Sequence, residues 1–291
     1  MKAMNIRIPI RSLLVAGLTI ASALMITPLL IMIFTSLKGD AEIANTAGSL
    51  LPKDWKFENY LLAMQSGKWG VYFQNSIIVT VCAVGGSLLF NTLSGYTFAR
   101  IDFKGREVIF IALLLGLMVP PQVTIITQFI ILKSVPLFGG NDWLGSGGQG
   151  LLDSYWALII PELSGSFGIF LSRQFYLGFP KEMDEAASID GSGIFRSFWT
   201  IYLPLSGPLL ATLGILKTVH VWNDFFHPLI YTNSEMMRTI QLGLQMFHGQ
   251  YEIKFNLLMA ASVVVSLPLC IAFFVFQRYF VQSMISTSVK G

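Results

Sequence analysis

Charged residues are scarce in this 291-residue chain, and cysteine and histidine are rarer still. Charged residues make up 12% of the chain, whereas hydrophobic residues make up 54%. A soluble domain carries about 25% charged residues, so this composition excludes an ordinary soluble domain. Long apolar segments occur in place of the missing charge, and we expect lipid to be the solvent for most of the chain.

The few cysteines and histidines exclude several kinds of site. Cys82 and Cys270 each lie inside an apolar segment and not in a loop, which argues against a disulfide framework. The 3 histidines show no spacing typical of a metal site. Gly67-Lys68 is followed by Trp69 and lacks the preceding glycine of a phosphate-binding loop. We therefore expect no catalytic, cofactor-binding or metal site here, so energy from ATP must come from another chain.

Six segments are long and apolar enough to cross a membrane, which takes about 20 residues for roughly 30 Å of hydrocarbon. They are residues 13–36, 75–99, 108–132, 155–176, 205–231 and 257–276. The first is longer than the apolar region of a secretory signal, which has about 7 to 15 residues, so we expect it to be retained as a span. The sequence thus predicts an all-α, multi-pass membrane protein, with residues 1–291 forming a single transmembrane domain.

The distribution of lysine and arginine predicts the orientation, because cytoplasmic loops carry the excess of these residues. With the N-terminus inside, the inner segments and the adjoining span ends hold more lysines and arginines than the outer segments. Six spans then place both termini in the cytoplasm. The net charge of +3 follows mostly from this topology, and we expect the lipid bilayer, but no nucleic acid, as a partner.

A polar loop, residues 178–204, connects the fourth and fifth predicted spans on the cytoplasmic side. Pro180 ends the preceding span, and residues 181–189 form helix with acidic side chains near the start, where they are favourable. Ala186 and Ala187 give this helix a smooth surface that a partner can approach closely.

The second half of the loop returns the chain to the membrane. Asp190-Gly191 predicts a turn, and residues 194–201 predict an apolar, aromatic helix before Pro204 opens the next span. By spacing alone, the resulting helix-turn-helix segment is either a docking element for a partner or a packed corner of this chain.

The same loop carries a family signature. Glu185-Ala186-Ala187 is followed after three residues by Gly191, and after nine more by Ile201-x-Leu203-Pro204. This pattern resembles the EAA signature of permease subunits in bacterial ATP-driven importers, with every signature position present. More narrowly, the whole chain resembles the G-type permease subunit of maltose-type carbohydrate importers. The further motifs that carry this resemblance, in chain order, are Gly95-Tyr96-Thr97-Phe98-Ala99-Arg100, Met118-Val119-Pro120-Pro121, Phe179-Pro180, Asp190-Gly191, Trp222-Asn223-Asp224-Phe225, Pro228-Leu229 and Val289-Lys290-Gly291.

The resemblance implies a type I importer permease fold in a bacterial inner membrane, with a cytoplasmic coupling helix between the fourth and fifth spans. It implies an F-type homologous permease as partner, two ATPase subunits that bind ATP and magnesium, and a solute-binding protein outside. This chain would then be a non-catalytic subunit without a cofactor of its own. The residues implied in coupling to the ATPase are Glu185, Ala186, Ala187, Asp190, Gly191, Ile201, Leu203 and Pro204. The C-terminal Lys290-Gly291 fits a tail that reaches the ATPase pair.

The fifth predicted span carries polar groups that a membrane excludes unless they face a cavity or the interior of the bundle. At about 100° per residue, Lys217, His220, Asp224 and His227 fall within an arc of about 80° and so share one helix face. In one interpretation, Asp224 belongs to the outer end of the span and the basic groups pair with the partner subunit. In the other, these residues line a water-filled conduit of positive charge.

The two interpretations differ in the solute that they predict. A fixed cation helps little with a neutral sugar but attracts a uronate or a sugar phosphate. We expect import of an oligosaccharide, neutral in the first instance and acidic, such as a uronate oligomer, in the second. A solute other than a sugar stays an alternative.

Pro120-Pro121 lies in the middle of the third predicted span and must kink or break its helix, because proline lacks the backbone donor. A broken helix at mid-membrane often marks a transport pathway. A packing kink whose freed carbonyls are satisfied by neighbours is the other interpretation.

Two rival functions remain open. A secondary ion-coupled transporter would use carboxylates within the membrane, and Asp224 and Glu162 are candidates, although the chain shows no internal repeat of the kind common in such folds. A scaffold or sensor subunit would keep the docking loop without needing the polar helix face, and would bind an ATPase without solute flux.

Overall fold

The computed structural model describes residues 7–45, 49–249 and 253–288, so the terminal Val289-Lys290-Gly291 lies outside the described residues. Within these ranges every regular element is helical, apart from one isolated bridge between His248 and Ile253. The predicted all-α class is confirmed. The contacts divide the chain into two units, Met1–Trp69 with Leu244–Leu267 and Gly70–Gly243 with Pro268–Gly291, and each is described by itself.

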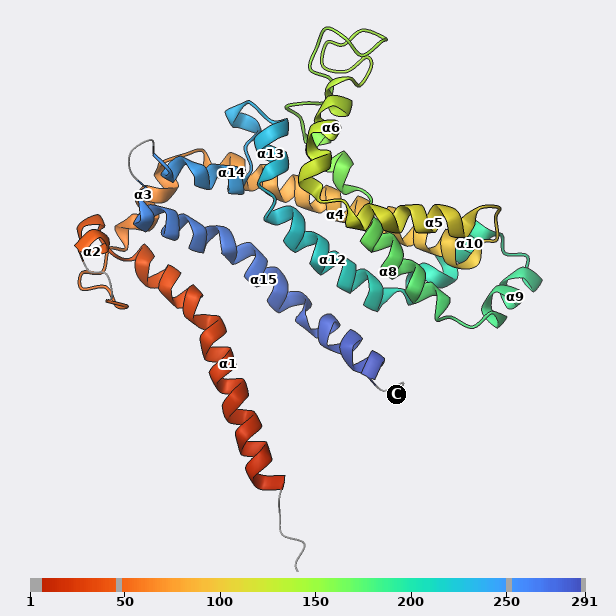
Figure 1. The fold of residues 1–291 in the computed structure, drawn as a ribbon, viewed down its shortest axis with the longest axis horizontal. Coiled ribbons are helices and arrows are strands. Elements are labelled where there is room, and N and C mark those ends of the chain that lie inside the picture. Colours follow the sequence, from red (N-terminus) through yellow and green to blue (C-terminus); the bar gives the residue numbers. More distant parts are fainter. Residues whose placement is uncertain (1–6, 46–48, 250–252, 289–291) are drawn as a thin grey trace, which may run out of the picture. The chain divides into compact units, whose positions relative to one another are not determined.

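The helices follow one another with few long connections (Figure 1). The α-helices are α1 (Arg7–Ser36), α2 (Asp40–Asn45), α3 (Glu58–Gln65), α4 (Trp69–Arg100), α5 (Arg106–Leu115), α6 (Pro121–Lys133), α7 (Tyr155–Ile159), α8 (Ser166–Leu177), α9 (Glu182–Ile189), α10 (Ile194–Ser197), α11 (Leu203–Leu205), α12 (Gly207–Trp222), α13 (Phe226–Tyr231), α14 (Ile240–Leu244) and α15 (Phe255–Ser288). Short 3-10 turns are η1 (Gly116–Met118), η2 (Ile160–Glu162), η4 (Glu235–Met237) and η5 (Gln245–Phe247), and η3 (Phe198–Tyr202) is a π-helix.

In the described part of the chain, length and composition give three single helices that could cross a membrane, and up to six spans when bent helix pairs are included. Three single helices qualify: Ser12–Ser36, Trp69–Arg100 and Phe255–Val275. Three helix pairs qualify together but bend at a break. These are Arg106–Met118 with Pro121–Lys133, bent by 108°, Tyr155–Glu162 with Ser166–Leu177, bent by 41°, and Ile194–Leu205 with Gly207–Trp222, bent by 78°. If each bent pair is one span, the total is the six that the sequence predicts, although half of them are not continuous helices.

The fifth predicted span was placed wrongly at its C-terminal end. Helix α12 ends at Trp222, and α13 begins as a separate helix at Phe226. Pro228 explains the break, because a proline has no N–H to donate to the carbonyl of residue 224 and its ring would clash with that carbonyl in a continuous helix. The side-chain amide of Asn223 also donates to the carbonyl of Val219 at 2.8 Å, at the end of α12.

Helices α4 and α8 approach each other closely in the second unit. A Cβ atom added at Gly95 would overlap Ser172, and one added at Gly168 would overlap the side chain of Asn91. Asn91 also accepts a hydrogen bond from the N–H of Gly165 at 3.0 Å, directly before the first turn of α8. Small residues therefore allow the two backbones to approach, as is common between helices in membranes.

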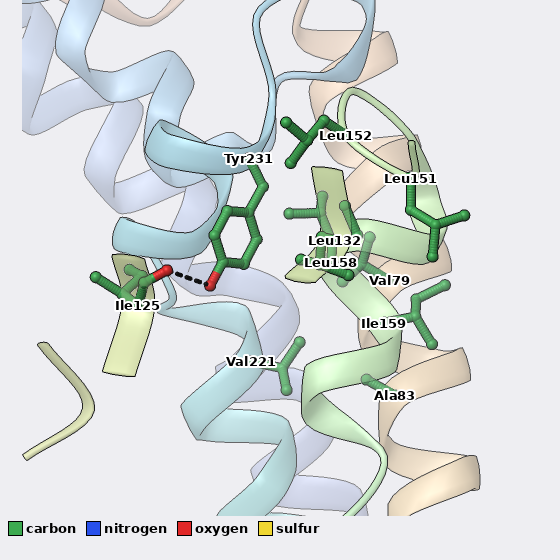
Figure 2. Close-up of a cluster of buried hydrophobic side chains, with 11 residues drawn as sticks. Val79, Ala83, Ile125, Leu132, Leu151, Leu152, Leu158, Ile159, Val221 and Tyr231 are labelled. Carbon is green, nitrogen blue, oxygen red and sulfur yellow. Dashed lines mark hydrogen bonds between the residues drawn. The ribbon is translucent and has the colours of Figure 1, made fainter. Parts of the chain in front are cut away.

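A buried apolar cluster lies where α6, α7, α12 and α13 meet the first half of α4 (Figure 2). Val79 and Ala83 of α4 and Leu158 of α7 belong to it, and so does Tyr231 of α13. The hydroxyl of Tyr231 points at α6 and donates to the carbonyl of Ile125 at 3.3 Å. This cluster holds the broken third span and the end of the fifth span against α4.

The first unit is stabilised by polar contacts around the end of α1. The side-chain amide of Asn59 on α3 donates at 2.8 Å to the carbonyl of Ser36, the last residue of α1, and at 2.9 Å to the carbonyl of Lys38, just beyond it. The last carbonyls of a helix have no intrahelical partner, and Asn59 supplies one. Trp69 donates from its indole to the carbonyl of Ala63 at 2.8 Å. The segment after α1 contains the short helices α2 and α3.

Candidate functional site

The loop 178–204 begins with a well-terminated helix. α9 carries three acidic residues in its first turn, and it ends at a glycine with a left-handed backbone, Gly191, whose φ is 70°. The N–H of Ser192 donates to the carbonyl of Ala187 at 2.8 Å, and the N–H of Gly191 donates to the carbonyl of Ser188 at 3.1 Å. This pair of bonds is a Schellman motif, which satisfies the last carbonyls of the helix. The predicted helix and turn are both present.

Several large apolar side chains of this loop are exposed. Ile189 is 86% exposed, Phe195 is 70% exposed, and Trp199 is 51% exposed. Large apolar side chains outside a core are informative when they gather in one segment, because such patches mark interaction sites. Ala187 is only 5% exposed. The expectation that Ala187 contributes to a smooth docking surface is therefore wrong, and of the two alanines only Ala186 is open to a partner.

The remaining signature residues lie in the return segment. Ile201 and Leu203 are half-buried and pack against an aromatic cluster that contains Phe198 and Tyr202. Pro204 is exposed and lies in α11, before the 78° bend that leads into α12. The π-helix over Phe198–Tyr202 is a local widening of the predicted helix. The family signature thus combines exposed residues in α9 with residues of the return segment that pack inside this chain.

A buried arginine attaches the loop to α4. Arg100 is the last residue of α4, and its side chain is 6% exposed. It donates to the carbonyls of Phe179 at 3.1 Å and Pro180 at 2.8 Å, and to the hydroxyl of Tyr202 at 3.0 Å. Its Nε lies 3.3 Å from the Oδ2 of Asp184 in α9, and the Tyr202 hydroxyl also donates to Asp184. The sequence predicted none of these contacts.

The polar residues of the fifth predicted span meet at one carboxylate. Lys217 forms an ion pair with Glu162, whose side chain is 7% exposed. The Nε2 of His220 lies 3.5 Å from Glu162, and the Nδ1 of His227 lies 3.6 Å from it. His227 is also 2.7 Å from the Oδ2 of Asp224. We refer to these five residues as the Glu162 cluster.

The four predicted residues come together for a reason other than the predicted one. Lys217 and His220 lie on α12, but Asp224 lies in the connection after it and His227 on α13, so the four do not form one helix face. The break at residue 223 turns Asp224 and His227 back toward η2, where Glu162 lies. Glu162 was the missed partner. Its signal in the sequence was a carboxylate inside the fourth apolar segment, where an unpaired charge is expensive.

Three members of the Glu162 cluster offer a possible metal-ligand set. Among the described residues, ligand atoms of Glu162, Asp224 and His227 lie within 4.8 Å of one another. The contact between His227 and Asp224 has a hydrogen-bond length of 2.7 Å, and the ammonium of Lys217 already pairs with Glu162. A cation would have to displace that ammonium, so the donor set fits an ion-pair network better than a metal centre. The absence of a metal site stays a prediction.

The proline pair breaks the third span as predicted. Val119 and Pro120 have extended backbones between η1 and α6, and the helix axis turns by 108° there. Pro121 occupies the first turn of α6, where its missing N–H is harmless. Met118 is 79% exposed and Val119 is 44% exposed, so the break faces away from the interior of this chain. Whether it lines a pathway stays a prediction.

The chain belongs to the family described as "Binding-protein-dependent transport system inner membrane component", whose match covers residues 91–286. The matched range includes the loop 178–204, the proline pair and the Glu162 cluster. The protein is therefore an ABC importer permease, a membrane component of a transporter that depends on a binding protein.

Comparison with individual proteins supports this assignment over nearly the whole chain. The "Arabinooligosaccharides transport system permease protein AraQ" of Halalkalibacterium halodurans is 32% identical over 282 residues, which are 96% of this chain and 96% of that protein. The "Probable ABC transporter permease protein YurM" of Bacillus subtilis is 35% identical over 266 residues, 91% of this chain and 83% of that protein. A chain in the crystal structure of a bacterial ABC transporter involved in the import of alginate aligns with a TM-score of 0.76 and 21% identity, covering 96% of this chain and 99% of that one. The predicted type I permease fold is thus confirmed.

Proposed function

We propose that this chain is the membrane-spanning subunit of an ATP-driven importer and that it moves an oligosaccharide delivered by a solute-binding protein. The observation that carries this proposal is the loop 178–204, in which the capped helix α9 exposes Ile189 and the following helix α10 exposes Phe195. Such a surface suits docking to a soluble subunit that supplies the energy. The oligosaccharide follows from relatives such as AraQ, whose name states transport of arabinooligosaccharides.

The proposal includes the partners expected from the family resemblance. An F-type homologous permease completes the membrane part. Two ATPase subunits bind ATP and magnesium, and the loop 178–204 docks onto one of them. This chain holds no cofactor and catalyses no reaction. Both termini lie in the cytoplasm, which places the loop 178–204 on the side where ATP is available.

A neutral oligosaccharide is the solute class that the Glu162 cluster supports best. Lys217 is paired with Glu162 inside the chain, and Asp224 holds His227. The Nε2 of His220 also lies 3.5 Å from Glu162. Each cationic or potentially cationic group of the cluster thus has an anionic partner close by, which leaves little fixed positive charge for an acidic solute. The polar surface that remains, including the imidazole of His220 at 60% exposed, can hydrogen-bond to hydroxyl groups.

An acidic oligosaccharide is the second candidate, because His220 is exposed next to Lys217 and gains positive charge when it is protonated. The family assignment does not favour a secondary ion-coupled transporter. A solute other than a sugar would leave the fold and the docking loop unchanged, and only a transport assay with defined solutes separates these cases.

ATP hydrolysis in liposomes tests the proposal. The chain is reconstituted with its permease partner and ATPases, and its binding protein is loaded with either neutral or uronate oligosaccharide. We expect stimulation by the neutral oligosaccharide. Stimulation by the uronate alone would transfer the proposal to the acidic class, and stimulation by neither, with uptake of neither, would reject oligosaccharide transport.

A further inference from the structure

We infer that Arg100 is a positioning residue that holds the loop 178–204 to the end of α4 and passes a displacement of α9 into the membrane span. The inference rests on the proposed function, because the agent that displaces α9 is the partner ATPase. It concerns a residue outside the signature 185–204. Arg100 does not touch the partner surface itself, since its side chain is 6% exposed within this chain.

The first step of the argument is the number of segments that Arg100 joins. Its acceptors are the carbonyls of Phe179 and Pro180 before α9, the carboxylate of Asp184 within α9, and the hydroxyl of Tyr202 after it. A guanidinium has five N–H donors in a rigid plane, so one side chain can hold several acceptors in a set geometry. The start, the middle and the return segment of the loop are thereby attached to one point on α4.

The second step is what the loop would do without this attachment. The two connections that join α9 to its neighbours contain glycines, Gly178 before the helix and Gly191 and Gly193 after it. Glycine allows a wide range of backbone angles, so these connections can bend when α9 is pushed. The bonds from Arg100 to Phe179 and Pro180 hold the first connection. A displacement of α9 is then transmitted to α4 and is not lost in bending of this connection.

The third step is that the anchor point is itself rigid. The ring of Tyr202 lies 4.9 Å from that of Tyr96 and 5.8 Å from that of Tyr176, measured between centroids. Tyr96 is on α4 and Tyr176 on α8. Five residues before Arg100, Gly95 leaves no room between α4 and Ser172 of α8. Close-packed interiors transmit displacement because they are hardly compressible, so α4 and α8 move together with the loop.

A measurement of solute moved per ATP hydrolysed tests this inference in the reconstituted complex. The variant is Arg100→Gln, which removes the charge and most donors. The matched control is Arg173→Gln on α8, since Arg173 is also largely buried, at 13% exposed. It pairs with Glu107 at 2.8 Å, donates to the carbonyl of Phe98 and lies over the ring of Phe110, all of which are outside the loop 178–204.

We expect Arg100→Gln to assemble with the ATPase and to hydrolyse ATP, while the solute moved per ATP falls about tenfold, as a lost coupling free energy of ordinary size would produce. Arg173→Gln should keep the ratio of the unchanged protein. A merely structural role for Arg100 would lower the amount of assembled complex and leave this ratio unaltered. An unchanged ratio in Arg100→Gln overturns the inference.

Asp184→Asn provides a second test in case Arg100→Gln does not assemble. Asp184 is 39% exposed, and asparagine keeps its shape while removing the charge that faces Arg100. We expect a smaller fall in solute per ATP, about threefold, with normal assembly, and an unaltered ratio would again overturn the inference. The proposed function fails in a different way, namely when the unchanged protein shows no uptake and no stimulation by the loaded binding protein.

Discussion

The loop 178–204 and the Glu162 cluster are both held by an ion pair with a buried member, but the two pairs differ in access to water. In the loop, Arg100 is 6% exposed and its partner Asp184 is 39% exposed. In the cluster, Lys217 is 18% exposed and Glu162 is 7% exposed. Water at Asp184 weakens the attraction there, and it also stabilises a charge whose partner has gone. Glu162 and Lys217 have no such support.

The difference indicates separate tasks for the two regions. A pair that water can reach can lengthen and re-form when the loop is displaced. A pair withheld from water keeps one arrangement, since separation would leave an isolated charge in a medium of low dielectric. The loop 178–204 is therefore the adjustable region, and the Glu162 cluster holds η2, α12 and α13 in one fixed relation.

Removal of the charge on Glu162 should have the largest effect on stability, because it disrupts the ion pair that is withheld from water. Glu162→Gln leaves the ammonium of Lys217 buried without an anionic partner, and we expect a loss of about 3–5 kcal/mol in stability. Thermal unfolding in detergent measures it. The double variant Glu162→Gln with Lys217→Met removes both charges and should recover most of the loss. Equal melting temperatures for Glu162→Gln and the unchanged protein would contradict a dry ion pair.

The packing behind the loop can be tested at two glycines of α4. A methyl group at Gly95 overlaps Ser172 and the backbone of α8, whereas a methyl group at Gly85 meets nothing within 4 Å. We expect Gly95→Ala to destabilise by about 1–3 kcal/mol, because the helices must move apart. Gly85→Ala serves as the matched control and should change the melting temperature little. If both alanines behave alike, α4 and α8 are less tightly packed than the structure indicates.

A smaller effect is expected at the turn after α9. Gly191 has a φ of 70°, which an alanine adopts only with strain, so Gly191→Ala should destabilise the loop by about 1 kcal/mol. The control is Gly193→Ala, because Gly193 has a φ of −73° that any residue accepts. Hydrogen exchange of the α9 amides reports the local stability. Faster exchange in the control than in Gly191→Ala would refute this account of the turn.

The smallest effect concerns a carboxylate outside the two regions. Partial burial raises the pKa of Asp153, but hydrogen bonds from the N–H groups of Ser234 and Asn233 and from the Ser234 hydroxyl, each 3.0 Å long, outweigh it and lower the pKa. The ionised form of Asp153 is thus the one that links the connection before α7 to the connection after α13. Its contribution to stability is complete above the unfolded pKa of about 3.9 and is lost as the pH falls through the lower folded value.

Hydrogen exchange at Ser234 between pH 5 and pH 3, at matched intrinsic rates, tests the role of Asp153. We expect protection to fall toward the acid end in the unchanged protein. Asp153→Asn should show weak protection at both ends, because an amide is a weaker acceptor than a carboxylate. Protection that is independent of pH in the unchanged protein would contradict an ionised Asp153 as the acceptor.

Much of the fold could be predicted from local sequence. The six apolar segments, the break at Pro120-Pro121 and the helix and turn of the loop each depend on a short stretch of chain. The error at the end of the fifth span was avoidable, because Pro228 forbids the helix that the helical-face argument assumed. The burial of Ala187 could not be predicted from the sequence, since alanine is equally suited to a docking surface and to a close contact within the chain.

The candidate sites divide along the same line. The sequence by itself determined the class of protein, the place of the loop 178–204 and the polar residues Lys217, His220, Asp224 and His227, because composition, periodicity and motif spacing are properties of neighbouring residues. The tertiary structure alone decided that Glu162 neutralises Lys217, and that Arg100 reaches the loop 178–204. Both partnerships join residues far apart in the chain, and the energy of a buried charge depends on the distance to its partner and on the exclusion of water, which only the folded arrangement sets.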